Sequence, residues 1–222
     1  MLINFHTHTP SKNEKVISVV SFEPYQFNLA TVSQNSNQYA TAGFHPWSIA
    51  DGTPNYDELS KALMDCTTIG LGEVGLDKLK GPTLEVQIQV FKKQLNIANK
   101  LSKPVIVHCV KAWDEIIGIK KKHFGTKPWA IHGFNGNSQL AEQLLDTGFY
   151  LSVGAALLNK ESKIRLALRK IPLNRLFLET DDRKISIEAV YNEATKLLNL
   201  NKKSIEVQLQ DNFQDFFGIT LH

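Results

Sequence analysis

The amino-acid sequence predicts an α/β fold, a (β/α)8 barrel of the TIM type. The first observation behind this prediction is a series of eight short runs, rich in β-branched and aromatic residues and mostly apolar on both faces. Strands of a buried parallel sheet have this character. The runs are Leu2–Phe5, Val16–Phe22, Tyr39–Phe44, Thr68–Gly72, Val105–His108, Trp129–Phe134, Tyr150–Val153 and Leu176–Glu179.

The second observation is that amphipathic stretches with apolar residues at helical spacing follow most of these runs. They are Tyr56–Met64, Leu84–Leu101, Ala112–Lys122, Asn137–Thr147, Lys160–Lys170, Ile187–Leu198 and Lys203–Phe217. Asn137 or Ser138 is a suitable N-cap for the fourth stretch, and Ser186 is suitable for the sixth. Alternation of strands and helices indicates a parallel sheet with crossover helices.

The third observation concerns length. The chain has 222 residues, whereas a TIM barrel usually has about 250. Only Thr9–Lys15 separates the first two runs, and a helical crossover needs about ten residues or more. We therefore expect the helix between strands one and two to be missing, with the barrel open or distorted there. The connection Glu23–Gln38 is also weak as a helix. A single domain spanning residues 1–222 is expected, because no linker or repeat interrupts the pattern.

Charge, cysteine content and hydropathy limit the kind of protein that this sequence encodes. The formal net charge is +3 and no long block of one sign occurs, so charge neither demands nor excludes a polyanionic substrate. Cys66 and Cys109 do not form a disulfide framework, and we expect Cys109 to be a packed thiol. The sequence has no recognisable signal peptide or membrane span, so a cytoplasmic protein without a membrane partner is expected.

Ionisable side chains gather where the predicted strands end. His6 and His8 are two residues apart and therefore point to the same face of the first strand. The side chains at or just beyond the other ends are His45, Glu73, His108, His132, Glu179, Asp181 and Asp182. Active sites of barrels are built on this face. One histidine near a strand is commonly a hydrogen-bonded core residue, but so many ionisable groups would be costly to bury without a cation.

The sequence therefore predicts a metal centre with six candidate ligands, which are His6, His8, Glu73, His108, His132 and Asp181. One catalytic ion usually takes three protein ligands, so six ligands suit two ions. We assign His6, His8, Glu73 and Asp181 to one ion. Glu73, His108 and His132 are assigned to the other, with the two oxygens of Glu73 as the bridge. The expected cofactors are two divalent ions (zinc, manganese, magnesium, iron, cobalt or nickel), among which the sequence does not choose.

Six short motifs occur in a fixed order along nearly the whole chain. They are His6-Thr7-His8, Gly43-Phe44-His45-Pro46, Gly72-Glu73-Val74-Gly75-Leu76-Asp77, Lys103-Pro104-Val105-Ile106-Val107-His108, Ile131-His132-Gly133-Phe134 and Leu178-Glu179-Thr180-Asp181. Together they resemble the TatD family of metal-dependent hydrolases, the TatD-related deoxyribonucleases. The resemblance implies a barrel, one or two divalent metals on the six positions named above, and hydrolysis of phosphodiester bonds, best known for DNA.

The chain also departs from the family pattern. Asn4 stands where the family usually has aspartate, and Lys78 stands where an aromatic residue is usual. Lys111 is the nearest cation after His108, where the family often has arginine. Because all six metal positions are kept while the loops are trimmed, the reaction type is better defined than the substrate.

The expected mechanism uses a water whose pKa the shared ions lower, so that hydroxide attacks phosphorus in line. Asp181 is expected to orient this nucleophile and accept its proton, and Glu73 to join the ions. His45 either contacts the substrate phosphate or a leaving oxygen, or is a loop histidine fixed beside Pro46. Lys111 and Arg183 either contact phosphate or are solvated surface charges.

The predicted function is a metal-dependent phosphodiesterase or deoxyribonuclease that acts on DNA or a small phosphodiester, with no obligate protein partner. Two alternatives stay open. One is an amidohydrolase-type enzyme that cleaves a C–N or ester bond at the same centre, because the hydroxide suits either electrophile. The other is a non-catalytic metal-binding protein, which the trimmed loops favour and the intact ligand set opposes.

Overall fold

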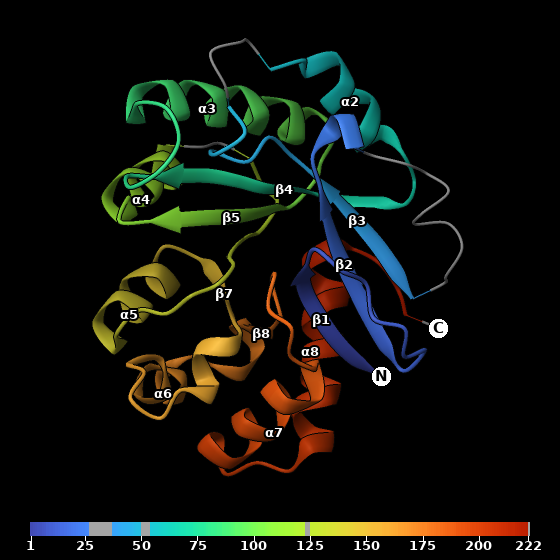
Figure 1. Cartoon of the computed structure of the whole chain (residues 1–222), viewed down its shortest axis with the longest axis vertical. Coiled ribbons are helices and arrows are strands. Elements are labelled where there is room, and N and C mark those ends of the chain that lie inside the picture. The colour runs from blue at the N-terminus through green and yellow to red at the C-terminus, as the bar shows by residue number, and fades with distance from the viewer. Residues whose placement is uncertain (27–36, 50–53, 123–124, 222) are drawn as a thin grey trace. The chain divides into compact units, whose positions relative to one another are not determined.

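The computed structural model describes residues 1–26, 37–49, 54–122 and 125–221. Eight strands form one sheet in chain order, and the pairs β1–β2, β3–β4, β4–β5 and β7–β8 are parallel. The strands are β1 (Leu2–Thr7), β2 (Val16–Phe22), β3 (Gln38–Ala42), β4 (Thr68–Asp77), β5 (Val105–Val110), β6 (Trp129–Ile131), β7 (Phe149–Val153) and β8 (Leu176–Leu178) (Figure 1). The fold is of the TIM-barrel type, as predicted.

Helices follow most of the strands. They are α2 (Tyr56–Met64), α3 (Leu84–Lys100), α4 (Trp113–Lys122), α5 (Ser138–Asp146), α6 (Ile164–Ala167), α7 (Ile187–Leu198) and α8 (Lys202–Phe217). Short 3-10 turns are η1 (Pro24–Gln26), η2 (Ala155–Leu158), η3 (Leu168–Lys170) and η4 (Leu173–Arg175). The side chains of Asn137 and Ser186 cap α5 and α7 by accepting bonds from Leu140 N and Ala189 N. Ser186 was the predicted N-cap of α7, and Asn137 was one of the two predicted candidates for α5, with Ser138.

The predicted helix Lys160–Lys170 is wrong in its first part, because regular helix begins at Ile164 and ends in η3. Asn159 supplies the reason. Its Oδ1 accepts a bond from Glu161 N, and its carbonyl accepts one from Ser162 N. These local bonds build a turn, which delays the start of the helix.

Three strands extend beyond their predicted ends, and β1, predicted to stop at Phe5, continues to Thr7. β4 was predicted to stop at Gly72 and β5 at His108, but the two pair as far as Asp77 and Val110. Gly75 permits this close pairing, since a Cβ atom there would lie 2.0 Å from the carbonyl oxygen of His108. Glu73 therefore lies within β4 and not at its end, which corrects the predicted placement.

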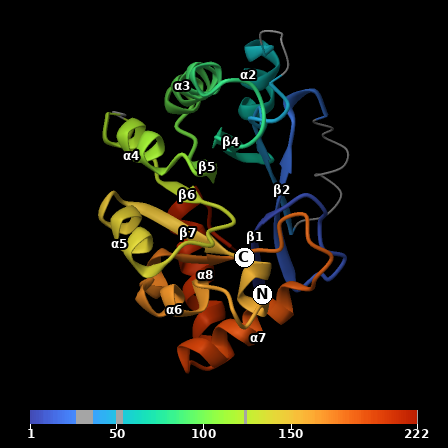
Figure 2. The same cartoon turned by 60° about the vertical axis from the view of Figure 1, so that its left-hand side comes forward.

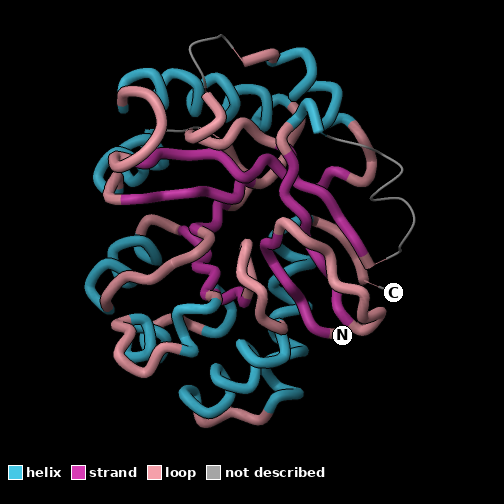
Figure 3. Tube along the Cα trace, viewed as in Figure 1, coloured by secondary structure: helices cyan, strands magenta, loops and turns pink. Residues whose placement is uncertain are grey.

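The link between β1 and β2 contains no helix in residues 8–15, which are all described. Figure 3 shows this link as a loop. Backbone bonds close it, from Leu2 N to Lys15 O and from Val16 N to Asn13 O. The missing helix is as predicted. Of the weak connection Glu23–Gln38, residues 27–36 lie outside the described residues.

The chain divides into two compact units, and the boundaries fall within β2 and β6. The first unit comprises Met1–Val20 and Ala130–His222, and the second comprises Ser21–Trp129. In the first unit, α8 packs beside β1 and β8 (Figure 1). Phe5 stacks on Phe177 at 3.9 Å between ring centroids and meets the edge of Phe216. In the second unit, α2 and α3 contact β4 and each other (Figure 2).

Both cysteines are free. Burial raises the pKa of the Cys109 thiol to about 12, which agrees with the expected packed thiol and opposes a thiolate ligand. None of the helices in the described part of the chain is long and apolar enough to cross a membrane.

Candidate active site

The first unit brings together His6, His8 and Asp181. His6 lies on β1, His8 directly follows that strand, and Asp181 lies three residues beyond the end of β8. The Asp181 Oδ1 atom is 3.7 Å from His6 Nε2 and 3.6 Å from His8 Nε2. One ligand atom from each side chain can be chosen so that all three lie within 4.8 Å of one another. We call these residues the first group.

The backbone holds the first group together across most of the chain length. Thr7 and Asp181 form an isolated parallel bridge. Asp181 N donates to His6 O at 3.0 Å, and His8 N donates to Asp181 O at 3.4 Å. Asp181 adopts a left-handed backbone conformation with φ of 55°, which aspartate tolerates better than most residues. These contacts place its carboxylate beside the two imidazoles.

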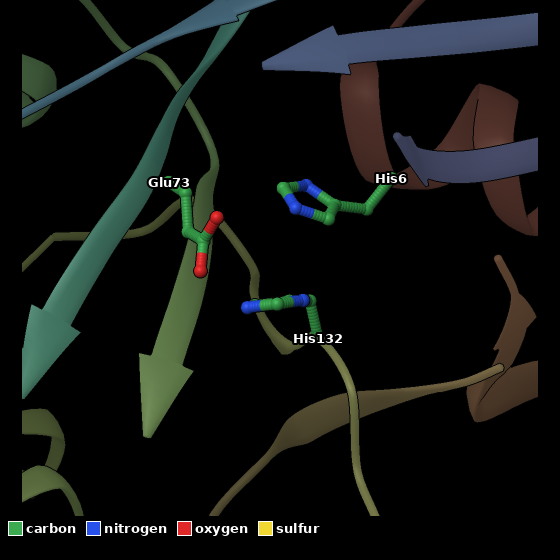
Figure 4. A group of neighbouring side chains, drawn as sticks. All are labelled: His6, Glu73 and His132. Atoms are coloured by element: carbon green, nitrogen blue, oxygen red, sulfur yellow. The ribbon is translucent and has the colours of Figure 1, made fainter. Parts of the chain in front are cut away.

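His132 also lies in the first unit, directly after β6. Its ring is 4.2 Å from that of His6, between centroids. Figure 4 shows both rings, drawn with the Glu73 carboxylate of the second unit. His132 Nδ1 is 3.4 Å from Oε1 of the fully buried Glu179, and this oxygen also accepts a bond from Gly133 N at 2.6 Å. Glu179 therefore lies directly beside the His132 ring.

The environment of Glu179 favours its charged form. Burial by itself raises the pKa of this carboxyl, but the hydrogen bond to His132 and the nearby His132 and His6 imidazoles outweigh that effect and lower it. A carboxylate behind a ligating histidine fixes the ring orientation and makes the imidazole a better donor to a metal. The sequence assigned Glu179 no firm role, and the structure places it beside His132.

The second unit brings together His45, Glu73 and His108, which we call the second group. Glu73 lies on β4, His108 on β5 and His45 in the segment after β3. Glu73 Oε1 is 2.6 Å from His108 Nδ1 and 3.1 Å from His45 Nε2. These three side chains also offer ligand atoms within 4.8 Å of one another. Ser21 supports the group by accepting a bond at its Oγ from Glu73 N at 2.9 Å.

Asp77 lies beside the second group, a position that the sequence reasoning did not predict. Its buried carboxylate lies 3.5 Å from His108 Nε2 and accepts a 2.7 Å bond from Trp47 Nε1. Burial by itself raises the pKa of Asp77, but bonds from Trp47 and Leu79 N and the nearby His108 lower it on balance. Its position in the Gly-Glu-x-Gly-Leu-Asp motif was the available signal.

The three residues predicted to contact substrate differ in how far they are exposed to solvent. His45 belongs to the second group, and its Nδ1 accepts a bond from Trp47 N at 3.1 Å. Lys111 directly follows β5, is exposed and has φ of 54°. Arg183 is exposed and pairs with Asp182 at 3.3 Å. It also lines a pocket of about 460 Å³ in the first unit, together with Asp181 and the short loop after β1.

Both groups have the chemistry that divalent ions require. Each offers imidazole nitrogens and carboxylate oxygen from side chains converging within 4.8 Å. Zinc, manganese, iron, cobalt and nickel accept such mixed sets. His6, His8 and Asp181 converge, and Glu73 converges with His108. The assignment of these side chains to two ions stays a prediction, as does the sharing of Glu73 between them.

Two groups of this kind on a TIM-type barrel define the class of metal-dependent hydrolases. A family model described as TatD related DNase matches residues 9–218. The chain therefore belongs to the TatD family.

Relatives support this assignment. The chain is 29% identical over 171 residues to the uncharacterized metal-dependent hydrolase YjjV of Escherichia coli K12, covering 75% of this chain and 66% of the relative. It is 31% identical over 180 residues to the uncharacterized metal-dependent hydrolase YabD of Bacillus subtilis 168, covering 77% and 70%. Several matches span only about half to two thirds of the relative's own length.

Solved structures agree on the fold. The crystal structure of YjjV, a TatD homolog from Escherichia coli K12, superposes with a TM-score of 0.87 at 24% identity, covering 99% of this chain and 98% of that chain. A TatD family hydrolase from Entamoeba histolytica gives a TM-score of 0.82 at 14% identity, with coverage of 99% and 98%.

Proposed function

We propose that this protein is a divalent-metal-dependent phosphodiesterase of the deoxyribonuclease type, acting on DNA or a small phosphodiester. The observation that carries the proposal is the convergence of carboxylate and imidazole donors within the first group and within the second group. The description of the matching family, TatD related DNase, favours phosphodiesters over other electrophiles.

We propose two ions, held by His6, His8, Glu73, His108, His132 and Asp181, with Glu73 as the shared ligand. When bound, such ions supply a water of lowered pKa and neutralise charge that develops on the phosphate oxygens. The carboxylates of Glu73 and Asp181 differ in solvent exposure, and this difference supports different roles for them. Glu73 is buried, with 5% of its side chain exposed, which suits a ligand. The Asp181 side chain is 34% exposed and lines the pocket, so solvent reaches it.

Asp181 therefore has the role of orienting the attacking water and taking its proton. A general base has to lie within hydrogen-bond reach of the water that it activates. His6 and His8 flank this carboxylate at 3.7 and 3.6 Å. Glu179 contributes indirectly by holding His132.

The substrate would extend from Asp181 into the neighbouring pocket. This pocket carries Arg183 and Lys184 on its rim, and guanidinium and ammonium groups suit phosphate. Lys111 is the corresponding exposed cation after β5. His45 has two roles open to it, contact with a phosphate oxygen or retention of Glu73 through their 3.1 Å contact.

The test is hydrolysis of bis-(p-nitrophenyl) phosphate and single-stranded DNA by the purified chain, with manganese, zinc or magnesium added separately. We expect cleavage that a chelator abolishes and that the ion restores. p-Nitrophenyl acetate and a p-nitroanilide serve as carbonyl substrates in the same assay. Cleavage of a carbonyl substrate with none of either phosphodiester would replace the proposal by the amidohydrolase alternative. Ion binding with no hydrolysis would favour the non-catalytic alternative.

A further inference from the structure

A chain of hydrogen bonds between buried side chains joins Asn4 to the backbone of Asp181. Asn4 Nδ2 donates to Thr180 Oγ1 at 2.8 Å, and Thr180 N donates back to Asn4 Oδ1 at 3.0 Å. Thr180 Oγ1 donates to Thr7 Oγ1 at 3.2 Å. Thr7 Oγ1 has two carbonyl acceptors, Thr9 O at 2.9 Å and Asp181 O at 3.2 Å. The side chains of Asn4, Thr180 and Thr7 are all buried. We call this chain of bonds the threonine relay.

The direction of the relay follows from chemistry. A backbone N–H can only donate, so the atom of Asn4 that faces Thr180 N must be the oxygen. The amide nitrogen of Asn4 is then the atom that donates to Thr180 Oγ1. Because Thr180 Oγ1 already accepts there, its proton is available for Thr7. The Thr7 proton is in turn available for the carbonyls of Thr9 and Asp181.

Asparagine is the residue that sets this direction. An ionised aspartate at position 4 has no hydrogen-bond donor. Its carboxylate would instead accept a hydrogen bond from the Thr180 hydroxyl. Thr7 would then either lose the hydrogen bond that Thr180 donates, or turn its own hydroxyl to donate to Thr180. In the second case the Thr7 hydroxyl would no longer donate to the Asp181 carbonyl. The amide at position 4, where the family usually has a carboxylate, is therefore coupled to the segment that carries a proposed metal ligand.

We propose that Asn4 is a positioning residue that acts through Thr180 and Thr7 to hold Asp181 opposite His6 and His8. The inference rests on the proposed function in one respect, namely that the first group binds a divalent ion. Asp181 has a left-handed backbone conformation. Its carbonyl oxygen accepts from His8 N and lies 3.2 Å from Thr7 Oγ1, whose single proton it shares with Thr9 O at 2.9 Å. A buried relay with every link paired stabilises one arrangement of such a segment.

The test compares valine with serine at the two threonines. Thr7→Val and Thr180→Val remove the hydroxyl at nearly constant volume, whereas Thr7→Ser and Thr180→Ser keep it. Thr68→Val is the matched control, since Thr68 is also a buried threonine but lies at the first residue of β4. All variants are made with His108→Ala, which removes a ligand of the second group. The measured quantities are the Zn²⁺ dissociation constant, by competition with a chromophoric chelator, and the Tm without metal.

We expect each valine variant to bind Zn²⁺ about 10-fold more weakly, the range known for residues that orient ligands. The serine variants and Thr68→Val should bind as the His108→Ala parent does. The double variant Thr7→Val with Thr180→Val should be no weaker than either single variant, because both cut the same relay. Asn4→Leu should give a similar loss if it folds, and the threonine variants decide the matter if it does not.

Unchanged Zn²⁺ affinity in both valine variants would overturn the inference, even if their Tm values fell, because the relay would then be merely structural. Equal losses in the serine and valine variants, or Zn²⁺ binding absent from the parent, would also overturn it. This experiment measures Zn²⁺ binding and not hydrolysis. A negative result here is therefore distinct from a negative result in the test of the proposed function. A chain that shows the expected Zn²⁺ pattern but cleaves no phosphodiester fails the proposed function alone.

Discussion

The two groups of candidate ligands are assembled in different ways. The first group joins residues from both ends of the sequence, His6 and His8 with Asp181, through a backbone bridge and the threonine relay. The second group takes Glu73 and His108 from neighbouring strands, and these two side chains contact each other directly at 2.6 Å. One group is thus ordered by the backbone and the other by its own side chains.

The difference has a consequence for ion binding. In the first group, the contacts of the Asp181 carboxylate with the imidazoles are 3.6 and 3.7 Å, longer than a hydrogen bond. In the second group, Glu73 makes contacts of hydrogen-bond length with two histidines, and an ion has to replace these contacts. We therefore expect the first group to depend on its supporting backbone and the second on the side chains around it.

The largest expected effects come from removing one carboxylate from each group. Asp181→Ala and Glu73→Ala should each lower kcat/KM for bis-(p-nitrophenyl) phosphate by about 10³-fold or more, since a base or a ligand is lost. Far-UV circular dichroism should show that both variants remain folded. Wild-type activity in either variant would remove that group from the reaction.

His45 tests whether the second group reaches the substrate. If it contacts phosphate, His45→Ala should raise KM by about 10-fold, the cost of one charge-assisted bond, while the ion content per chain stays the same. Steady-state kinetics and metal analysis of the same sample measure both quantities. A fall in ion content with unchanged KM would instead make His45 a ligand or a support of Glu73.

Trp47 tests the side-chain support of the second group. The bond from its Nε1 to the Asp77 carboxylate is 2.7 Å, and a bond to a charged group contributes about 1.5–3 kcal/mol. The Trp47 residue is 47% exposed, so we expect the lower value for Trp47→Phe, seen as a Tm lower by roughly 3–6 °C. A change in Tm below about 1 °C would show that Asp77 and His108 do not need this contact.

The smallest expected effect concerns two ion pairs, one in each unit. The hydrogen bond from Lys78 lowers the pKa of Glu115, and the bond from Arg165 lowers that of Glu193. A carboxyl whose pKa is lower in the folded state stabilises the protein above its unfolded pKa, and this contribution is lost as the pH falls through the folded pKa. Both pairs should therefore contribute at pH 7 and contribute little at pH 3.

Glu115→Gln and Glu193→Gln should each lower Tm at pH 7 by about 1–3 °C, since partly exposed pairs contribute up to about 1 kcal/mol. The loss should shrink at pH 3. Glu142→Gln, on an exposed position of α5, is the control. Equal losses at both pH values would mean that packing of the glutamate side chain, and not its charge, stabilises the protein.

The strand order and most helices could be predicted because apolar periodicity and capping residues are local signals. Residues at or near strand ends, such as His6, His8 and His108, could be placed near the other candidate ligands for the same reason. The extension of β4 to Asp77 could not be predicted, because it depends on pairing with β5 and on close approach at Gly75. The helix after Asn159 was predicted too long, since the periodic pattern gave no weight to the turn that this side chain builds.

The positions of Asp77 and Glu179 were harder to predict than those of the candidate ligands. Each acts on a histidine distant in the sequence, Asp77 on His108 and Glu179 on His132. Such pairings depend on side-chain directions in the folded chain. The relay through Thr180 and Thr7 had no signal in the sequence beyond the unusual Asn4.

The number of ions bound per chain tests the central claim most directly. After equilibrium dialysis against Zn²⁺, the unchanged protein should hold about two ions. His8→Ala with Asp181→Ala should reduce this to about one through the first group, and His108→Ala should do so through the second. A protein that binds one ion or none before any substitution would contradict the account, as would a double variant of the first group that still binds two.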